Sequence, residues 1–340
     1  MIKSYYNCQL FDQQIENLNN FIVRQEELSL DKVIQQSNSI ESSKYSFIKE
    51  EVEYICSFEQ QSDWHSGKVC VLMPTKDNLK LLNYTIRNLL EHKIPEIANI
   101  IIIDDRSTED LKSAVLSAGF SYLRVDNEKG FNFSMLNNIA AKICYDKNIK
   151  EVILWNSDLW CVSMYWLMDL LAQHEKESAT ITGTKLIYPP KNMSLNNIEN
   201  TENIKHYFPE MLGKWRDTVQ FGGDMFYDNA FHHYGRFKDK KEHRVNSDRG
   251  ATFVTGAFQI INLEKFIKLG GLNPSLAKNF QDVDWCLKVV EYGDKVLYLG
   301  KDKYFYHDES AILHGKKNDQ KMVSDQILFY KRWPNLMGLI

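Results

Sequence analysis

The sequence predicts an α/β fold with a mostly parallel central sheet, beginning near Lys68. Strand-like and helix-like segments alternate at regular spacing through the first half of this region, which is typical of strand–helix–strand units. The run Ile100 to Ile103 is apolar without interruption. Such a run indicates a strand buried on both faces, as in a parallel sheet flanked by helices.

Each element of the first half has its own signal. Apolar runs predict strands over 68–74, 97–105, 120–126 and 151–158. Helices are expected between them, over the apolar stripe Leu79 to Leu89, over 109–119 and over 132–146. The second half is less regular: residues 189–250 are polar and aromatic, which predicts a long loop region that is functional or mobile.

Three segments are expected along the chain. Residues 1–66 form a helical N-terminal extension, because apolar residues recur at helical spacing from Phe11 to Ile22. Residues 67–315 form the main domain, and 316–340 a C-terminal helical tail. The extension could mediate self-association. The tail mixes basic and aromatic residues and could rest on a membrane surface, although a packed terminal helix is favoured.

Composition excludes several classes of protein. The 340 residues carry a net charge of −4 and are 44% hydrophobic, which is normal for a globular protein and gives no reason to expect nucleic-acid binding. The start of the chain lacks the basic and apolar stretches of a secretory signal. No apolar run approaches the roughly 18 residues that span a bilayer. The six cysteines form no CxxC pair, so we expect reduced thiols and a cytoplasmic protein.

Acidic residues follow the apolar strands. Asp104 and Asp105 end one predicted strand and Asp158 ends another. Open α/β sheets bind ligands at the carboxyl ends of their strands, so these acids are expected to face one crevice. Taken alone, Asp104 and Asp105 also fit a turn in which Ser107 or Thr108 caps the following helix.

No GxGxxG follows the first strand, and no GxxxxGK[ST] occurs in the chain, so a dinucleotide-binding or P-loop enzyme is not expected. A phosphate group would instead be held through a divalent cation bound by carboxylates. His307, at the end of another apolar strand, could complete such a site begun by Asp158.

A second pair of acids opens a predicted helix. Val283, Leu287 and Val290 recur at helical spacing, which places Asp282 and Asp284 in the first turn. Either acid could simply favour the helix dipole. A carboxylate at the edge of a cleft can also take a proton from an attacking hydroxyl.

The order of these motifs resembles glycosyltransferase family 2, the inverting sugar-nucleotide-dependent enzymes of GT-A fold. The resemblance covers roughly residues 68–315. It rests on six motifs in order: VCVLMPTKD, IIIDDRSTED, NEKGFNFSMLNNIA, LWNSDLW, the block from TGAFQ to VLYLG, and YFYHDES. The stretch QDVDWC is most similar to a bacterial subgroup that includes rhamnan and capsule transferases.

The resemblance implies roles for individual residues. Asp158 and His307 would bind Mn²⁺ or Mg²⁺, and Asp282 would be the catalytic base, with Asp284 as the alternative. Asp284 and Trp285 would contact the acceptor. The implied donor-binding residues are Pro74, Thr75, Asp104, Asp105, Asn127, Gly130, Asn137, Asn156 and Ser157.

The implied substrates are a nucleoside-diphosphate sugar, UDP- or dTDP-linked, and a hydroxyl of a glycan or lipid-linked glycan in bacterial surface polysaccharide synthesis. The implied location is the cytoplasm, with peripheral association at the inner face of the plasma membrane as an option.

Two departures from the family pattern keep alternatives open. The metal motif begins with the amide Asn156 where an acid is usual, so a catalytically silent sugar-nucleotide or glycan-binding module is an alternative. Gln281 precedes Asp282 where Glu is commoner. A nucleotidyltransferase is a third interpretation, but MPTKDN lacks the glycines that its phosphate loop would need.

Overall fold

The computed structural model describes residues 56–60, 64, 69–126, 130–193, 195, 204–205, 208–227, 230–309 and 320–334. These residues belong to one compact unit, Phe47–Ile340. The predicted N-terminal helix from Phe11 to Ile22 lies outside the described residues, and so does Asn127.

A nine-stranded sheet forms the centre of the described unit. Its strands are β1 (Cys56–Glu59), β2 (Val69–Thr75), β3 (Ala98–Asp104), β4 (Ser121–Val125), β5 (Glu151–Trp155), β7 (Ile181–Thr184), β12 (Asp248–Gly250), β13 (Phe258–Asn262) and β14 (Val296–Leu299). Their order across the sheet is β1-β4-β3-β2-β5-β13-β7-β14-β12.

The strands β4, β3, β2 and β5 pair in parallel, as the alternation of strands and helices predicts. Strand β13 runs antiparallel to both of its neighbours. The chain enters β13 from a loop at the carboxyl end of β5 rather than through a crossover helix, so its direction is reversed. The α/β fold is thus confirmed, with a mixed sheet whose parallel block carries the predicted acids.

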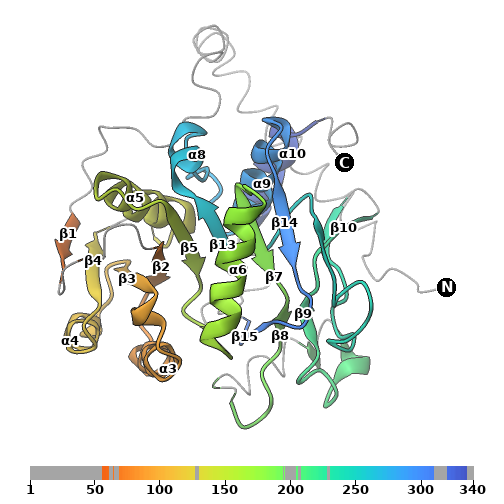
Figure 1. Cartoon of the computed structure of the whole chain (residues 1–340), viewed down its shortest axis with the longest axis horizontal. Helices are drawn as coiled ribbons and strands as arrows, with labels where there is room; N and C mark the ends of the chain where they lie inside the picture. Colours follow the sequence, from red (N-terminus) through yellow and green to blue (C-terminus); the bar gives the residue numbers. More distant parts are fainter. Residues whose placement is uncertain are drawn as a thin grey trace, which may run out of the picture. The chain divides into compact units, whose positions relative to one another are not determined.

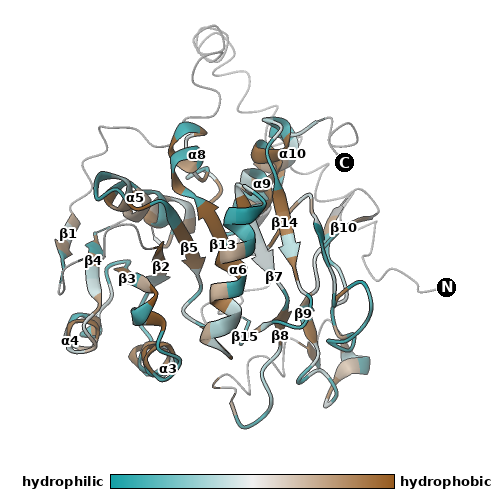
Figure 2. Ribbon diagram, viewed as in Figure 1, coloured by the Kyte–Doolittle hydropathy of each residue, from teal (hydrophilic) through white to brown (hydrophobic). Residues whose placement is uncertain are grey.

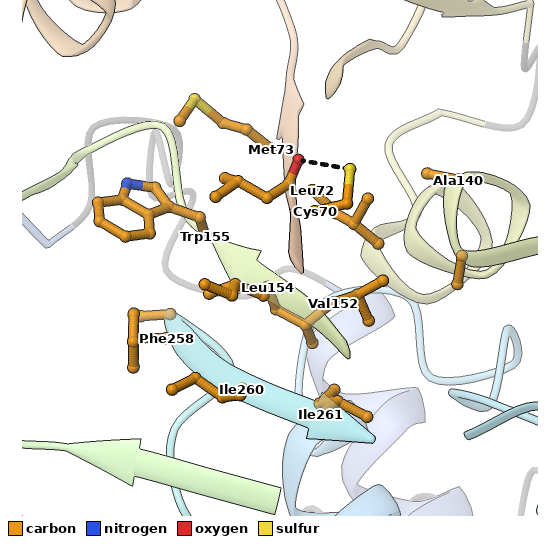
Figure 3. Close-up of a cluster of buried hydrophobic side chains, with 14 of the residues drawn as sticks. Cys70, Leu72, Met73, Ala140, Val152, Leu154, Trp155, Phe258, Ile260 and Ile261 are labelled. Carbon is orange, nitrogen blue, oxygen red and sulfur yellow. Dashed lines mark hydrogen bonds between the residues drawn. The ribbon is translucent and has the colours of Figure 1, made fainter. Parts of the chain in front are cut away.

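Apolar packing explains why these strands form the core. Every residue of β2 and β3 is buried, and Leu72 of β2 lies beside Leu154 of β5 in the ladder. Figure 3 shows side chains of β2, β5 and β13 meeting in one cluster with Ala140, and in Figure 2 β5 and β13 are brown, the hydrophobic end of the scale. Burying each such Leu or Ile contributes about 1.5–3 kcal/mol, so this block is well suited to support a site.

Helices cover the sheet. They are α3 (Leu79–Glu91), α4 (Leu111–Ser117), α5 (Phe133–Asp146), α6 (Met164–Lys176), α8 (Leu263–Lys268), α9 (Gln281–Glu291) and α10 (Gln320–Arg332), with short 3₁₀ turns η1 (Ile94–Glu96) and η2 (Pro209–Met211). Figure 1 shows α3 and α4 on one side of the parallel strands and α5 on the other. The side chain of Asp110 accepts from the Ser113 amide and caps α4, so the predicted cap at Ser107 or Thr108 is wrong. Those residues belong to the preceding turn.

The region 189–250 is not one long loop, contrary to our expectation. It contains β9 (Val219–Phe221) and a hairpin of β10 (Asp224–Tyr227) and β11 (Ala230–His233). A four-stranded sheet joins β9 to β6 (Leu159–Trp160), β8 (Leu186–Ile187) and β15 (Phe305–His307) in the order β6-β15-β8-β9. These strands have two to four residues, too few to show a period in the sequence.

The C-terminal segment packs as a helix against the rest of the unit. In α10, Phe329 is fully buried, and Trp333, directly after the helix, is almost fully buried. Within the described residues, no helix combines the length and the apolar character needed to cross a membrane.

Candidate active site at the carboxyl edge of the sheet

The parallel strands bring the predicted acids to one edge of the sheet. In the ladder, Thr75 at the end of β2 lies beside Asp104 at the end of β3. The Asp105 amide donates to the Thr75 carbonyl at 3.0 Å, so this pairing continues one residue further. Pro74 is within β2 itself. The two strand ends therefore form one wall, next to the end of β5.

Cations and hydroxyls hold the acids of this wall. Asp104 is fully buried. It accepts from the Ser107 amide at 2.8 Å and from the Tyr122 hydroxyl, and it pairs with Arg124 Nη1 at 3.0 Å. Asp105 is also buried and pairs with Lys76 at 3.2 Å. Both carboxylates are therefore fixed in direction, and each brings a basic side chain to the edge.

Tyr122 and Arg124 were not predicted as site residues. Together with Ser107 and Lys112 they line an open cavity of about 370 Å³ beside the acidic wall. Burial, with the adjacent Asp104, raises the pKa of the Tyr122 hydroxyl, so it stays protonated and donates. An arginine inside the apolar strand FSYLRVD was the available sequence signal, because an apolar strand rarely holds a guanidinium without a partner.

Helix α3 fixes the turn that follows β5. The Thr85 hydroxyl donates to the Ser157 carbonyl at 2.5 Å. The Asn88 side chain makes two hydrogen bonds to the backbone of Cys161. Its Nδ2 donates to the carbonyl at 3.0 Å, and its Oδ1 accepts from the amide at 2.8 Å. The Ser157 hydroxyl is buried and has no hydrogen-bond partner within the described residues. Two side chains of one helix thus hold the loop that carries Asn156 and Asp158.

Asp158 and His307 face each other across this loop. Asp158 Oδ1 lies 3.3 Å from His307 Nε2, and both side chains are almost fully buried. Within the described part of the chain, no hydrogen bond reaches this oxygen. The side-chain Nδ2 of Asn156 lies 3.5 Å from His307 Nε2. Burial acts to lower the pKa of His307, but the Asp158 carboxylate outweighs burial and raises it.

This pair fits a divalent cation. A carboxylate oxygen without a hydrogen-bond donor, close to an imidazole nitrogen, offers two ligands of the kinds that Mn²⁺ accepts. No group of three or more His, Cys, Asp or Glu side chains suited to a metal exists among the described residues. The protein would therefore supply two ligands, and the remaining positions would be filled by a bound phosphate and water.

Asp282 is held beside the same loop. Its Oδ2 accepts from the Gly256 amide at 2.7 Å, and its Oδ1 accepts from the Val283 amide at 2.9 Å. The carbonyl of the adjacent Ala257 accepts from the backbone amide of Asn156 at 3.0 Å. The hydrogen bonds of Gly256 and Ala257 thus connect Asp282 to the loop of Asp158. Burial raises the pKa of Asp282 although the backbone donors act to lower it.

Gly256 makes this arrangement possible. A Cβ atom at this position would lie 3.1 Å from the Asp282 Cβ and 3.4 Å from its Oδ2. A side chain at this position would require Asp282 to shift by a few tenths of an ångström. Asp282 itself is partly exposed, so a bound molecule can reach it.

Asp284 and Trp285 do not line the crevice, contrary to our prediction. Asp284 is fully buried, pairs with Arg332 at 2.6 Å and accepts from the Trp333 indole at 2.9 Å. Trp285 is fully buried against Phe266, with ring centroids 4.9 Å apart. On a helix, the residue two positions after Asp282 points away from it, and here both Asp284 and Trp285 lie in the core.

The remaining predicted donor-binding residues have different surroundings. Asn137 is fully buried in α5 and donates to the Phe133 carbonyl of its own helix at 2.9 Å, so we leave it out of the site. Gly130 has φ 88°, a conformation that favours glycine, and is partly exposed. Asn127 lies outside the described residues.

Several known proteins are similar to this chain. Residues 70–269 match the model of Glycosyl transferase family 2. The uncharacterized protein y4gI of Sinorhizobium fredii (strain NBRC 101917 / NGR234) is 25% identical over 252 residues, which cover 72% of this chain and 25% of that protein. The chain therefore spans about a quarter of the length of this relative.

Two solved structures share the fold. GalNAc-T7, solved with UDP, GalNAc and Mn²⁺, has a TM-score of 0.51 and 16% identity over 72% of this chain and 44% of its own. The mannosyltransferase PcManGT from Pyrobaculum calidifontis, solved with GDP-Man and Mn²⁺, has a TM-score of 0.50 and 11% identity over 85% of this chain and 68% of its own. These likenesses confirm the predicted GT-A fold. The family match spans more than half of the 340 residues, and this chain therefore belongs to glycosyl transferase family 2.

Proposed function

We propose that the protein moves a sugar from a nucleoside-diphosphate sugar, UDP- or dTDP-linked, to a hydroxyl of a glycan or lipid-linked glycan, with inversion at the anomeric carbon. One observation carries the proposal. Asp282, the candidate base, is joined through Gly256 and Ala257 to the loop that holds the candidate metal ligand Asp158. A base and a diphosphate site at one edge are what a direct displacement needs.

Asp282 would act on the acceptor. Its carboxylate takes the proton of the attacking hydroxyl while the oxygen bonds the anomeric carbon. The bond from that carbon to the diphosphate oxygen breaks, and the nucleoside diphosphate leaves. The raised pKa of Asp282 suits a general base, because proton transfer is most effective when the pKa lies near the working pH.

Asp158 and His307 would hold Mn²⁺ or Mg²⁺ beside the diphosphate. When bound, such an ion offsets the negative charge that develops on the leaving group. The two structural neighbours were solved with Mn²⁺ and a nucleotide or nucleotide sugar, which supports this assignment. Asn156 and Ser157, on the same turn, would lie next to the donor.

The wall formed by Thr75, Asp104 and Asp105 would receive the nucleoside. Arg124, fixed by Asp104, adds a donor that can bind carbonyl oxygens of a pyrimidine base. Lys76, paired with Asp105, brings a positive charge to the same edge and suits the phosphates. Pro74 and Gly130 would shape the entrance without side-chain bonds.

The role in bacterial surface polysaccharide synthesis is part of this proposal and rests on the motif QDVDWC. The cytoplasmic location is proposed from the cysteines, since those of the described residues are all free thiols. Peripheral membrane association and self-association stay predictions. The N-terminal helix from Phe11 to Ile22, which would mediate self-association, lies outside the described residues.

The proposal is tested by calorimetric titration of UDP and of dTDP, with and without Mn²⁺, into the wild type and Asp158→Ala. We expect metal-dependent binding of one nucleotide, weakened about tenfold or more in the variant. Asp146→Ala, on the exposed end of α5, is the matched control and should bind as the wild type does. Binding of neither nucleotide under any condition would contradict the proposal.

A catalytically silent binding module is the second candidate, because Asn156 stands where the family motif usually has an acid. The same titration followed by a turnover assay separates the two. Metal-dependent nucleotide binding without donor hydrolysis or transfer to any acceptor would favour the silent module.

A further inference from the structure

A network of polar side chains lies behind the Asp158–His307 pair. His307 Nδ1, on the ring side away from Asp158, lies 3.4 Å from Gln220 Oε1. Gln220 is buried in β9, and its Nε2 lies 3.3 Å from His233 Nδ1 at the end of β11. Strands distant in the sequence thus place one amide between two imidazoles.

The network continues to an arginine and an acid. Arg236 Nη2 lies 3.2 Å from the same His233 Nδ1. Arg236 also pairs with Glu309 at 3.0 Å, two residues after His307. The Tyr188 hydroxyl donates to Glu309 at 2.6 Å, and Phe221 packs edge-on against His233 at 4.9 Å. Each member is therefore held by at least one further contact.

The chemistry of the members fixes the direction of the hydrogen bonds. A guanidinium only donates, so His233 Nδ1 must accept from Arg236. Because that nitrogen then carries no proton, the Gln220 group that faces it must be the amide NH₂, which shares the lone pair with Arg236. The amide oxygen is therefore directed toward His307. Because an amide oxygen only accepts, His307 must carry its proton on Nδ1.

The other side of the His307 ring contains one donor and one acceptor. Asn156 Nδ2, a donor, lies 3.5 Å from Nε2, as expected if Nε2 carries a lone pair. Asp158 Oδ1 is 3.3 Å from Nε2 and accepts no hydrogen bond within the described residues. The Asn156 contact suits a lone pair on Nε2, whereas the Asp158 carboxylate by itself favours a proton there. The Nδ1–H tautomer therefore depends on the Gln220 contact, and in that tautomer Nε2 and Asp158 Oδ1 are both available to a cation.

We propose that Gln220 is a positioning residue that holds His307 as the Nδ1–H tautomer, with Nε2 directed toward Asp158 for metal binding. His233, Arg236 and Glu309 set the direction of the Gln220 amide. The inference deepens the proposed function, because it rests on Asp158 and His307 as the metal site. Loss of a hydrogen-bond partner of a metal-binding histidine typically lowers metal affinity by about 10–100-fold.

The first test is the tautomer of His307 in metal-free protein labelled with ¹⁵N-histidine, measured by two-dimensional NMR at alkaline pH, where the imidazole is neutral. His307→Gln assigns the signal by its loss. We expect the Nδ1–H tautomer in the wild type and in Gln220→Glu, which keeps an acceptor toward His307. In Gln220→Leu the proton should move to Nε2, where Asp158 can accept it.

The second test is Mn²⁺ affinity by electron paramagnetic resonance in the presence of the nucleotide that the wild type binds. Gln220→Leu should bind Mn²⁺ about tenfold or more weakly. The surface variant Gln173→Leu on α6 is the matched control and should change neither readout. His233→Leu, which removes the acceptor, provides a second variant if Gln220→Leu does not fold.

The outcomes separate the inference from the proposed function. An Nε2–H tautomer in the wild type, or unchanged tautomer and Mn²⁺ affinity in Gln220→Leu, would overturn the positioning role while leaving the metal site intact. Absence of Mn²⁺ binding in the wild type would overturn both, since no ligand would then need positioning.

Discussion

At the scale of single residues, substitution of Asp282 gives the most direct test of the mechanism. Two backbone amides hold its carboxylate, and burial raises its pKa. In Asp282→Asn the shape and one acceptor oxygen remain but the base is lost. We expect the rate of sugar transfer to fall about 10²–10⁴-fold, with nucleotide binding unchanged in calorimetry.

The pH profile of the wild type tests the same residue. A base works only when deprotonated, so kcat/KM should fall about tenfold per pH unit below the raised pKa of Asp282. Asp146→Asn, an exposed change on α5, should keep both the rate and the profile. Transfer at the wild-type rate by Asp282→Asn would remove Asp282 from the mechanism.

At the scale of elements, α10 holds the start of α9. The buried Asp325 accepts from the amides of Lys278 and Asn279, at 2.8 and 3.0 Å, just before the helix of Asp282. Phe329 stacks on Phe280, with ring centroids 4.7 Å apart. The C-terminal helix is therefore part of the support of the candidate base.

Asp325→Ala should expose this role. Two amides would lose their acceptor in a buried place, which costs about 1–3 kcal/mol for each unsatisfied group. We expect a lower free energy of unfolding in urea, and a lower transfer rate with nearly unchanged nucleotide binding. Lys331→Ala, exposed on the same helix, is the control. Equal stability of Asp325→Ala and the wild type would show that α9 does not depend on α10.

At the scale of the whole molecule, stability should depend on pH through His174. This side chain of α6 is almost fully buried beside Thr182 of β7, at 2.8 Å from its hydroxyl. Burial lowers its pKa from 6.5 to about 4. Between these values the unfolded chain binds a proton that the folded chain does not, so stability falls as the pH drops from about 6.5 to about 4.

The size of this effect follows from the shift, at about 1.4 kcal/mol for each pH unit, or about 3 kcal/mol in all. His233, whose pKa burial and Arg236 lower to about 3, acts in the same direction. His174→Gln should flatten the pH dependence of urea unfolding, whereas exposed His243→Gln should not. An unchanged slope in His174→Gln would contradict the assignment.

Much of the fold could be predicted because its signals are local. The strands expected over 97–105 and 151–158 are observed at Ala98–Asp104 and Glu151–Trp155, since continuous short apolar runs are typical of strands buried on both faces. The strand-end acids Asp104 and Asp158 were found in the same way. Short strands such as Val219–Phe221 escaped prediction because three residues carry no period.

The sequence by itself determined the α/β class, the parallel block and the order of motifs along the edge, because each depends on neighbouring residues. Only the tertiary structure decided that Asp284 turns to Arg332 while Asp282 turns to Gly256. Only it brought Gln220 and His233 behind His307. These contacts join residues 13 to 87 positions apart. Hydropathy patterns describe which face is buried, not which polar partner a side chain meets there.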